Sequence, residues 1–158
     1  MRKMWRKFIG TAALTFMLCL TGLIMSGAAF AQQCVDNGDG TVTDNGTGLM
    51  WQKETAGPMD WDTAMSYAPS LSLGGHSGWW LPSKDELLGL YHSQCKSLME
   101  VVSSGYWSST TNANNTNNAW HVIFNNGNVN NNNKSNSSYV RAVRDAHSKP
   151  SSNIIIKF

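Results

Sequence analysis

The stretch YWSSTTNANNTNNAWHVIFNNGNVNNNNKSNSSYVRAVR, residues 106–144, decides the fold of this chain. Thirteen of the 27 residues in 112–138 are asparagine, yet apolar side chains recur at Trp120, Val122 and Phe124 with one residue between them. Such alternation is the period of a strand with one buried face.

A turn follows this strand directly. Asn126-Gly127 is the residue pair that best accommodates the positive φ angles of a tight hairpin turn. The stretch therefore predicts β-structure with fixed inward positions and a monotonous polar exterior. The alternative is an asparagine-rich low-complexity segment, which would show neither alternation nor flanking strands.

The first 31 residues predict a secretory signal peptide. Four basic residues within positions 2–7 precede an apolar run over 8–30, and Ala29-Phe30-Ala31 fits the small-residue cleavage pattern. The alternative is an uncleaved membrane anchor, since the run is nearly long enough to span a bilayer. We expect cleavage, no membrane span afterwards, and a periplasmic, extracellular or cell-surface location.

Without residues 1–31 the chain is mildly acidic. The leader holds four of the 12 basic residues and none of the 10 acidic ones, which leaves a net charge of −2. This balance gives no electrostatic basis for binding nucleic acid. Residues 32–148 are long enough for one packed domain, and their six tryptophans argue against disorder. The apolar tail, 149–158, is compatible with an edge strand or with an interface.

Two cysteines remain after the leader, Cys34 and Cys95. In an exported protein an isolated pair most often forms a disulfide, and this one would close a loop of about 60 residues. The alternative, a reactive thiol or metal site, lacks a C-x-x-C pattern and histidines at ligand spacing. The segment 35–46 has the residue types of a calcium loop without its spacing, and turn chemistry explains it equally well. We expect a disulfide, no metal site and no cofactor.

One hairpin and one short helix are predicted before residue 70. Residues 34–53 read as two strands around an Asn45-Gly46 turn. Residues 59–68 read as a helix with Asp60 as N-cap, ended by Pro69. Its apolar face has the spacing i, i+3, i+4, i+7. That face contains Trp61, Ala64, Met65 and Ala68.

A second helix is predicted to begin with a capping box formed by Ser83 and Glu86, followed by an apolar face at Leu87, Leu90 and Tyr91. Glu86 is alternatively a catalytic acid of a hydrolase, as is Asp85, but the cap already gives Glu86 a structural role.

The remaining acids and histidines form no recognisable catalytic set, and no nucleophile, zinc or phosphate-binding motif is present. We therefore do not expect an enzyme. We also expect at least one of Arg141 and Arg144 to pair with Glu86 or Asp85, because both arginines lie in an otherwise apolar strand.

Six segments, in order, carry a resemblance to a known family. They are DNGDGTVTDNGTGLMWQ (36–52), W-x-x-A-x-x-Y (61–67), L-G-G-x-S-x-W-W-L-P-S-x-x-E-L (73–87), YWSST (106–110), A-W-x-V-x-F-x-x-G (119–127) and YVRAVR (139–144). Together they resemble the Lcl C-terminal-like domain of bacterial collagen-like adhesins. The resemblance implies an α+β fold of the C-type-lectin-like kind, loop-rich, with two short helices packed on small antiparallel sheets.

The chain departs from this family at several positions. Trp80 stands where the family usually has arginine, and Gly78 where it has aspartate, so any salt bridge of that pair is lost. Ala68 and Ala142 replace two cysteines together, which implies a family disulfide that this chain lacks. The calcium motifs of C-type lectins and the paired active-site cysteines of formylglycine-generating enzymes are absent, so neither activity carries over.

The asparagine block resembles the variable region of target proteins of diversity-generating retroelements. Their templates are rich in AAC codons, and changing one adenine yields Thr, Ser, His, Ile or Tyr, the types that interrupt this asparagine run. The resemblance implies a binding surface for a protein or glycan ligand on a cell or matrix surface. A fixed adhesin that binds glycan or matrix without diversification is the alternative. The implied ligand-binding residues are Asn112, Asn114, Asn115, Asn117, Asn118, His121, Asn125, Asn126, Asn128, Asn130, Asn131, Asn132, Asn133, Ser135, Asn136 and Ser138.

Overall fold

The computed structural model describes residues 33–148 of the 158-residue chain. The predicted signal peptide (1–31) and tail (149–158) lie outside the described residues. Within 33–148, no helix combines the length and the apolar character needed to cross a membrane.

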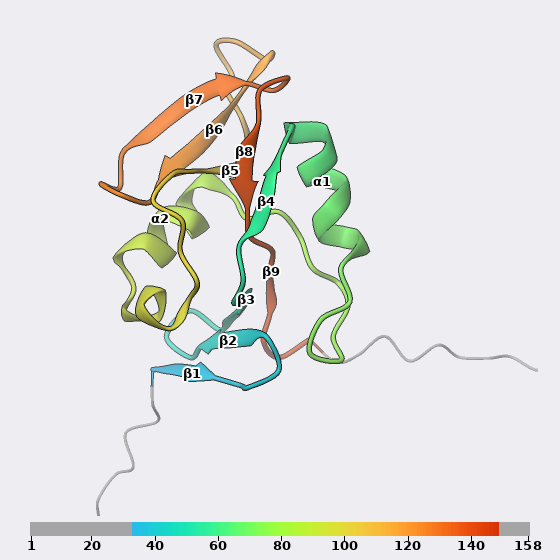
Figure 1. Cartoon of the computed structure of the whole chain (residues 1–158), viewed down its shortest axis with the longest axis vertical. Helices are drawn as coiled ribbons and strands as arrows, with labels where there is room; N and C mark the ends of the chain where they lie inside the picture. The colour runs from blue at the N-terminus through green and yellow to red at the C-terminus, as the bar shows by residue number, and fades with distance from the viewer. Residues whose placement is uncertain (1–32, 149–158) are drawn as a thin grey trace, which may run out of the picture.

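Two sheets and two helices form an α+β fold (Figure 1). The first sheet, in the order β1-β2-β3-β9, is antiparallel. Its strands are β1 (Cys34–Asp36), β2 (Thr41–Asp44), β3 (Leu49–Gln52) and β9 (Val143–Asp145). The second sheet, in the order β4-β8-β5-β6-β7, has one parallel pair, β5 with β8. Its strands are β4 (Ala56–Met59), β5 (Gly105–Thr111), β6 (Asn118–Ile123), β7 (Val129–Asn133) and β8 (Ser138–Val140).

Two chain segments pass from one sheet into the other. β3 leads into β4, and β8 leads into β9. The segments run side by side, because Trp51 pairs with Val143 in the first sheet and Ala56 pairs with Val140 in the second. The predicted hairpin over 34–53 is confirmed by the pairing of β2 with β3, and β1 adds a third strand to it.

Helix α1 (Trp61–Ser70) begins at its predicted cap but differs from its predicted extent of 59–68. The Asp60 carboxylate accepts hydrogen bonds from Thr63 N at 2.8 Å and Thr63 Oγ1 at 2.9 Å. Pro69 does not end the helix. It lies in the last turn, where only one further residue is helical. The predicted apolar face is partly wrong, because Ala64 and Ala68 are buried whereas Met65 is exposed.

Helix α2 (Lys84–His92) has the predicted capping box. Ser83 N donates to Glu86 Oε2 at 2.7 Å, and Glu86 N donates to Ser83 Oγ at 3.2 Å. Leu87 and Leu90 are buried, as predicted for this face, and a short 3₁₀ helix, η1 (Gln94–Leu98), follows α2.

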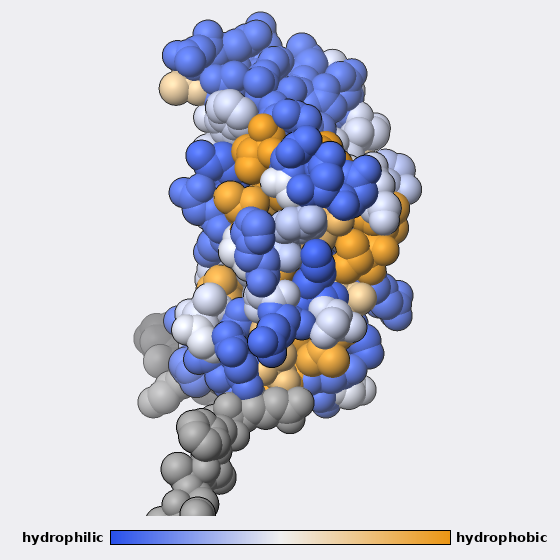
Figure 2. Space-filling model, turned by 90° about the vertical axis from the view of Figure 1, so that its left-hand side faces the viewer, coloured by the Kyte–Doolittle hydropathy of each residue, from blue (hydrophilic) through white to orange (hydrophobic). Residues whose placement is uncertain are grey.

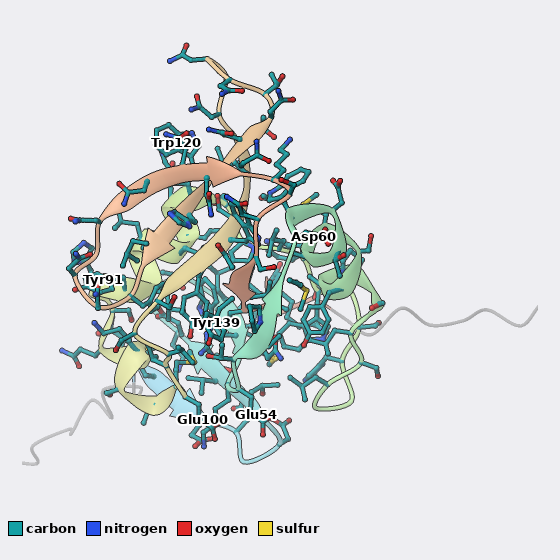
Figure 3. The ribbon with its side chains drawn as sticks, turned by 45° about the horizontal axis from the view of Figure 1, so that its top comes forward. Glu54, Asp60, Tyr91, Glu100, Trp120 and Tyr139 are labelled. Carbon is teal, nitrogen blue, oxygen red and sulfur yellow. A yellow bond between two sulfur atoms is a disulfide. The ribbon has the colours of Figure 1, made fainter. Side chains whose placement is uncertain are left out.

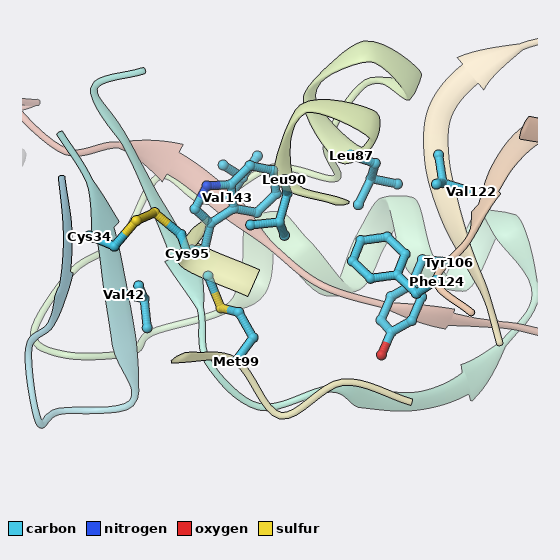
Figure 4. Close-up of a cluster of buried hydrophobic side chains, with 11 residues drawn as sticks. Cys34, Val42, Leu87, Leu90, Cys95, Met99, Tyr106, Val122, Phe124 and Val143 are labelled. Atoms are coloured by element: carbon cyan, nitrogen blue, oxygen red, sulfur yellow. A yellow bond between two sulfur atoms is a disulfide. The ribbon is translucent and has the colours of Figure 1, made fainter. Parts of the chain in front are cut away.

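The two helices cover opposite faces of the second sheet. Consecutive side chains on β5 point in opposite directions, so Tyr106 packs with the buried leucines of α2 and Trp107 packs with the buried alanines of α1. The predicted disulfide is confirmed: Cys34 and Cys95 join β1 to η1 with an S–S distance of 2.00 Å (Figure 4). Ala142 is buried in the same cluster as Ala68, as expected if cysteines at both positions form a bond in other family members.

The β6–β7 hairpin follows the predicted alternation with one exception. Val122 and Phe124 are buried, but Trp120 is only half-buried. The turn is confirmed: Gly127 N donates to Ile123 O at 2.7 Å, with φ of +75° at Gly127. Glycine is needed here because a Cβ would come within 2.4 Å of the Tyr91 ring.

The predicted pairing of Arg141 or Arg144 with an acid on α2 is wrong. Both guanidinium groups are buried and donate to loop carbonyl oxygens instead. Arg144 donates to Ser77 O at 2.6 Å and to Ser148 O at 2.9 Å. Carbonyl dipoles stabilise these cations without a carboxylate, and only Nε of Arg141 has no hydrogen-bond partner among the described residues.

Arg141 lies where the two segments change sheets. Its guanidinium donates to Gln52 O, to Lys53 O at 2.5 Å, to Glu100 O at 2.6 Å and to Thr55 Oγ1 at 2.9 Å. Arg141 therefore fixes the chain between β3 and β4 against the loop that precedes β5.

The segment with calcium-loop residue types forms turns. Asp36 accepts from Gly38 N and pairs with Lys53, and Asp39 accepts from Thr41 N. In the described part of the chain no three His, Cys, Asp or Glu side chains are grouped so that they could hold a metal ion.

Candidate functional site

The asparagine-rich stretch forms the β6–β7 hairpin and the loops on either side of it, at one end of the molecule (Figure 1). Figure 2 shows that the face drawn is almost uniformly hydrophilic at this end. We call the exposed side chains of 112–138 the hairpin surface.

Two of the sixteen predicted ligand-binding residues are not available to a ligand. Asn112 is 8% exposed and Ser138 is 6% exposed. Asn112 is buried because its side chain accepts from Asn114 N and so closes the turn after β5. Ser138 is buried because it enters β8 in the middle of the sheet. Three others are half-buried, namely Asn118, His121 and Asn132.

The remaining eleven are exposed, but they do not converge on one point. Loops 112–117 and 134–137 lie at one end of the hairpin, and the 124–128 turn lies at the other. A strand rises about 3.3 Å per residue, so β6 separates these ends by roughly 20 Å. In Figure 3 one labelled residue marks each end of the hairpin. Asp60, at the start of α1, lies near the loop end, and Tyr91, on α2, lies near the turn end.

At the loop end three chain segments surround a hollow of about 610 Å³. The segments are the start of α1, the loop before β6 and the loop after β7. Every lining side chain is polar or charged. The lining residues are Asp60, Asp62, Thr116, Asn117, Asn133, Lys134 and Ser135.

Main-chain hydrogen bonds hold these three segments together. Trp61 N donates to Lys134 O at 3.0 Å, and Lys134 N donates to Asn117 O at 2.9 Å. The Trp61 indole donates to Ser108 O at 2.8 Å and carries the Lys134 ammonium 3.9 Å from its ring centroid. Main-chain hydrogen bonds therefore fix the backbone around the hollow, and two of the lining side chains, Asp60 and Asn133, add a helix cap and a turn.

Two carboxylates and one ammonium group set the charge of the hollow. Hydrogen bonds from the backbone N–H and then the hydroxyl of Thr63 lower the pKa of Asp60, which keeps this carboxylate ionised. Asp62 and Lys134 form no ion pair with described residues. The hollow is thus polar with a small negative balance, and it suits a hydrophilic ligand.

The family model of the Lcl C-terminal domain matches residues 40–144, which include all three segments of the hollow. The chain belongs to the Lcl C-terminal domain family. No curated protein matches the chain. The match places the hairpin surface within the Lcl C-terminal domain, between its two helices and its final strands.

Four asparagines of this Lcl C-terminal domain close turns with their own side chains. Each accepts a hydrogen bond through Oδ1 from the main-chain N–H two residues later, at 3.0 to 3.2 Å. This pattern is the Asx turn. The four are Asn112, Asn115, Asn126 and Asn133. A fifth, Asn132, accepts from Asn133 N and from Asn136 Nδ2.

Other asparagines are exposed and have side chains that bond to none of the described residues. They are Asn114, Asn117, Asn125, Asn128 and Asn130. Asn118 and Asn131 bond to each other across β6 and β7. The block that looks uniform in sequence therefore contains a turn-forming set and a free set.

His121 differs from the asparagines. Its half-buried imidazole lies 5.7 Å from the Trp107 ring and 3.4 Å from Ser138 Oγ, and burial lowers its pKa. A side chain at Gly105 would clash with the ring, at 2.8 Å from Nδ1. His121 is therefore a packed residue rather than a free contact group.

Sequence reasoning missed Asp60, Asp62 and Lys134 as neighbours of the hairpin surface. Asp60 and Asp62 show only the signal of a helix start, and nothing local connects them to a loop more than 50 residues away. Their position becomes evident only from the pairing of Trp61 with Lys134.

Proposed function

We propose that this chain is an exported ligand-binding module that uses the hairpin surface to contact its ligand. One observation carries the proposal: backbone hydrogen bonds fix three segments around the hollow, while five of the seven side chains that line it are exposed. A rigid backbone with exchangeable polar side chains is also how antibody loops present serine and asparagine to antigen. Membership of a family named for collagen-like adhesins supports a surface location.

We further propose that the arrangement is of the C-type-lectin-like kind. Two features support this: the two helices pack on opposite faces of one sheet, and the first and last described strands, β1 and β9, belong to the same small sheet.

Asparagine offers hydrogen-bond donors and acceptors but little apolar area. Strong contacts at protein interfaces come mostly from Trp, Tyr and Arg. A surface of asparagines therefore binds weakly, and replacement by tyrosine strengthens binding. The chain as it stands corresponds to a nearly undiversified surface.

The proposal is tested with named probes and a matched tyrosine control. Binding of the chain without its leader to immobilised collagen, fibronectin and heparin is measured for the wild type, for Asn117→Tyr and for Gln94→Tyr. Asn117 lines the hollow, whereas Gln94 is exposed on η1, away from the hairpin. We expect Asn117→Tyr to lower the Kd for at least one probe about tenfold, and Gln94→Tyr to leave it unchanged. Equal affinities of all three proteins for every probe would contradict the proposal.

We propose diversification of this surface by retroelement copying as the origin of the asparagine block. Thr116, Ser135 and His121, which interrupt the block, are residue types reached from AAC codons by one adenine change. The test is the gene: a second near-copy of the block with AAC at the asparagine codons, beside a reverse transcriptase gene. Mixed AAT and AAC codons without such neighbours would favour the fixed adhesin.

A further inference from the structure

We infer that specificity on the hairpin surface is carried by Asn114, Asn117, Asn125, Asn128 and Asn130, and that the partner they contact is a folded protein. This inference rests on the proposed binding function. It divides the asparagines by what each side chain does in the fold, a division that the sequence does not show.

The turn-forming set is constrained by its own hydrogen bonds, so a substitution there changes the loop as well as the contacts. Asn133 illustrates the point: its Oδ1 accepts from Ser135 N at 3.0 Å and from Ser135 Oγ at 2.7 Å, and its N–H donates to Asn132. An alanine at such a position releases the turn, so the loop changes shape along with its side chain. A substitution at such a position therefore alters the backbone conformation of the loop and not only the side-chain contacts.

The free set has the opposite property. All five side chains are exposed, and all five lack an intramolecular bond to described residues. Asn114, Asn117 and Asn128 donate their main-chain N–H groups to the turns, while their side chains are exposed. Each can be replaced without removing a stabilising interaction, so each is available to tune affinity.

The positions of the free set indicate the size of the partner. Asn114 and Asn117 lie at the loop end, Asn125 and Asn128 at the turn end, and Asn130 on β7 between them. The free set spans roughly 20 Å along the hairpin, which is longer than a mono- or disaccharide. A span of this length fits within the patch of about 800 Å² that a protein partner covers.

The aromatic rings near the free set favour a protein over a glycan. Sugars are held largely by stacking on open aromatic faces. Lys134 lies 3.9 Å over Trp61, and Lys84 lies 5.7 Å over the half-buried Trp120. Both rings therefore carry an ammonium group where a sugar would stack, and the five free amides are uncharged hydrogen-bonding groups suited to a polar protein surface.

Two matched display libraries of the chain without its leader test the inference. One randomises the free five positions, and the other randomises Asn112, Asn115, Asn126, Asn132 and Asn133. Each library is scored for the fraction of folded, displayed clones and is selected against lysozyme, streptavidin and chitohexaose. Single variants Asn130→Ala and Asn133→Ala, measured by urea unfolding, provide a control outside display.

We expect the free library to display near the wild-type level and to give binders to at least one folded protein probe, with a Kd at least tenfold below that of the starting chain. We expect the turn library to lose display several-fold and to give no binders. Asn133→Ala should raise the unfolding equilibrium constant about fivefold, and Asn130→Ala less than twofold.

Three outcomes overturn the inference, and they are distinguishable. Equal display of the two libraries, or equal unfolding of the two alanine variants, refutes the division of the asparagines. Binders to chitohexaose alone refute the protein partner. A retained display difference with no binder to any probe refutes the proposed binding function itself, and with it any assignment of specificity.

Discussion

We expect the Arg141→Met variant to lose about 3 kcal/mol of unfolding free energy, a large part of the 5 to 15 kcal/mol that is usual for a domain. Methionine keeps much of the side-chain volume but removes every donor. Three main-chain carbonyls then lose their partner at the junction of the two sheets, those of Gln52, Lys53 and Glu100.

The magnitude follows from the burial of those carbonyls. A buried acceptor without a donor costs about 1 to 3 kcal/mol. The bond to Gln52 O is fully buried, which suggests about 2 kcal/mol, whereas Lys53 O and Glu100 O are partly accessible and can recruit water, at about 1 kcal/mol each. The variant also no longer buries a cation that lacks a carboxylate partner among the described residues, and this offsets the loss of unfolding free energy by about 1 kcal/mol.

The assay is urea unfolding followed by tryptophan fluorescence. With a slope of about 1.5 kcal/mol/M, the midpoint should fall by about 2 M. Lys53→Met is the matched control, because it removes a cation at the same junction whose ammonium forms only a surface pair with Asp36; its midpoint should move by less than about 0.5 M. Arg141→Met unfolding within about 0.5 M of the wild type, about 0.75 kcal/mol at that slope, would refute the role assigned to the guanidinium.

Three further predictions concern stability. Reduction of the Cys34–Cys95 bond, which spans 61 positions, should lower the unfolding free energy by about 4 kcal/mol, and identical urea midpoints with and without dithiothreitol would contradict the loop-entropy argument. Burial lowers the pKa of His121 below 6.5, so the unfolded state binds the proton more readily. The unfolding free energy should therefore be constant above pH 6.5, fall as the pH drops from there to the lower folded pKa, and then level off. A His121→Gln variant that keeps this slope would rule out His121 as its cause. Gly127→Ala, with positive φ and a ring at 2.4 Å from its Cβ, should lose about 2 kcal/mol, whereas Gly89→Ala, in open space on α2, should gain about 0.5 kcal/mol; thermal shifts of the same sign in both variants would show the steric reasoning to be wrong.

Features that depend on near neighbours could be predicted from the sequence. The capping box needs only Ser83 and Glu86, three residues apart, and the hairpin turn needs only Asn126-Gly127. The disulfide follows from there being a single cysteine pair after residue 31. Resemblance to the family supplied the remaining α+β outline.

Features that depend on distant contacts could not be predicted. The acceptors of Arg141 lie 41 to 89 positions away in the sequence. They are mainly carbonyl oxygens, whereas a carboxylate was expected. The burial of Asn112 and Ser138 and the lysine over Trp61 likewise arise from tertiary packing. Alternation alone marked Trp120 as buried, but its ring meets the ammonium of Lys84, at the start of α2, and stays half-buried.

Because the strands that complete both sheets follow the asparagine block, the chain folds only when the whole block has been translated in frame. β8 must insert between β4 and β5, and β9 must complete the ladder beside β3, and both are encoded after the asparagine block. A copying error that shifts the reading frame or introduces a stop codon within the block deletes both closing strands and the Arg141 junction with them. Under the diversification proposed above, only copies that keep the reading frame would yield a folded molecule, so truncated variants would be lost before any ligand is met.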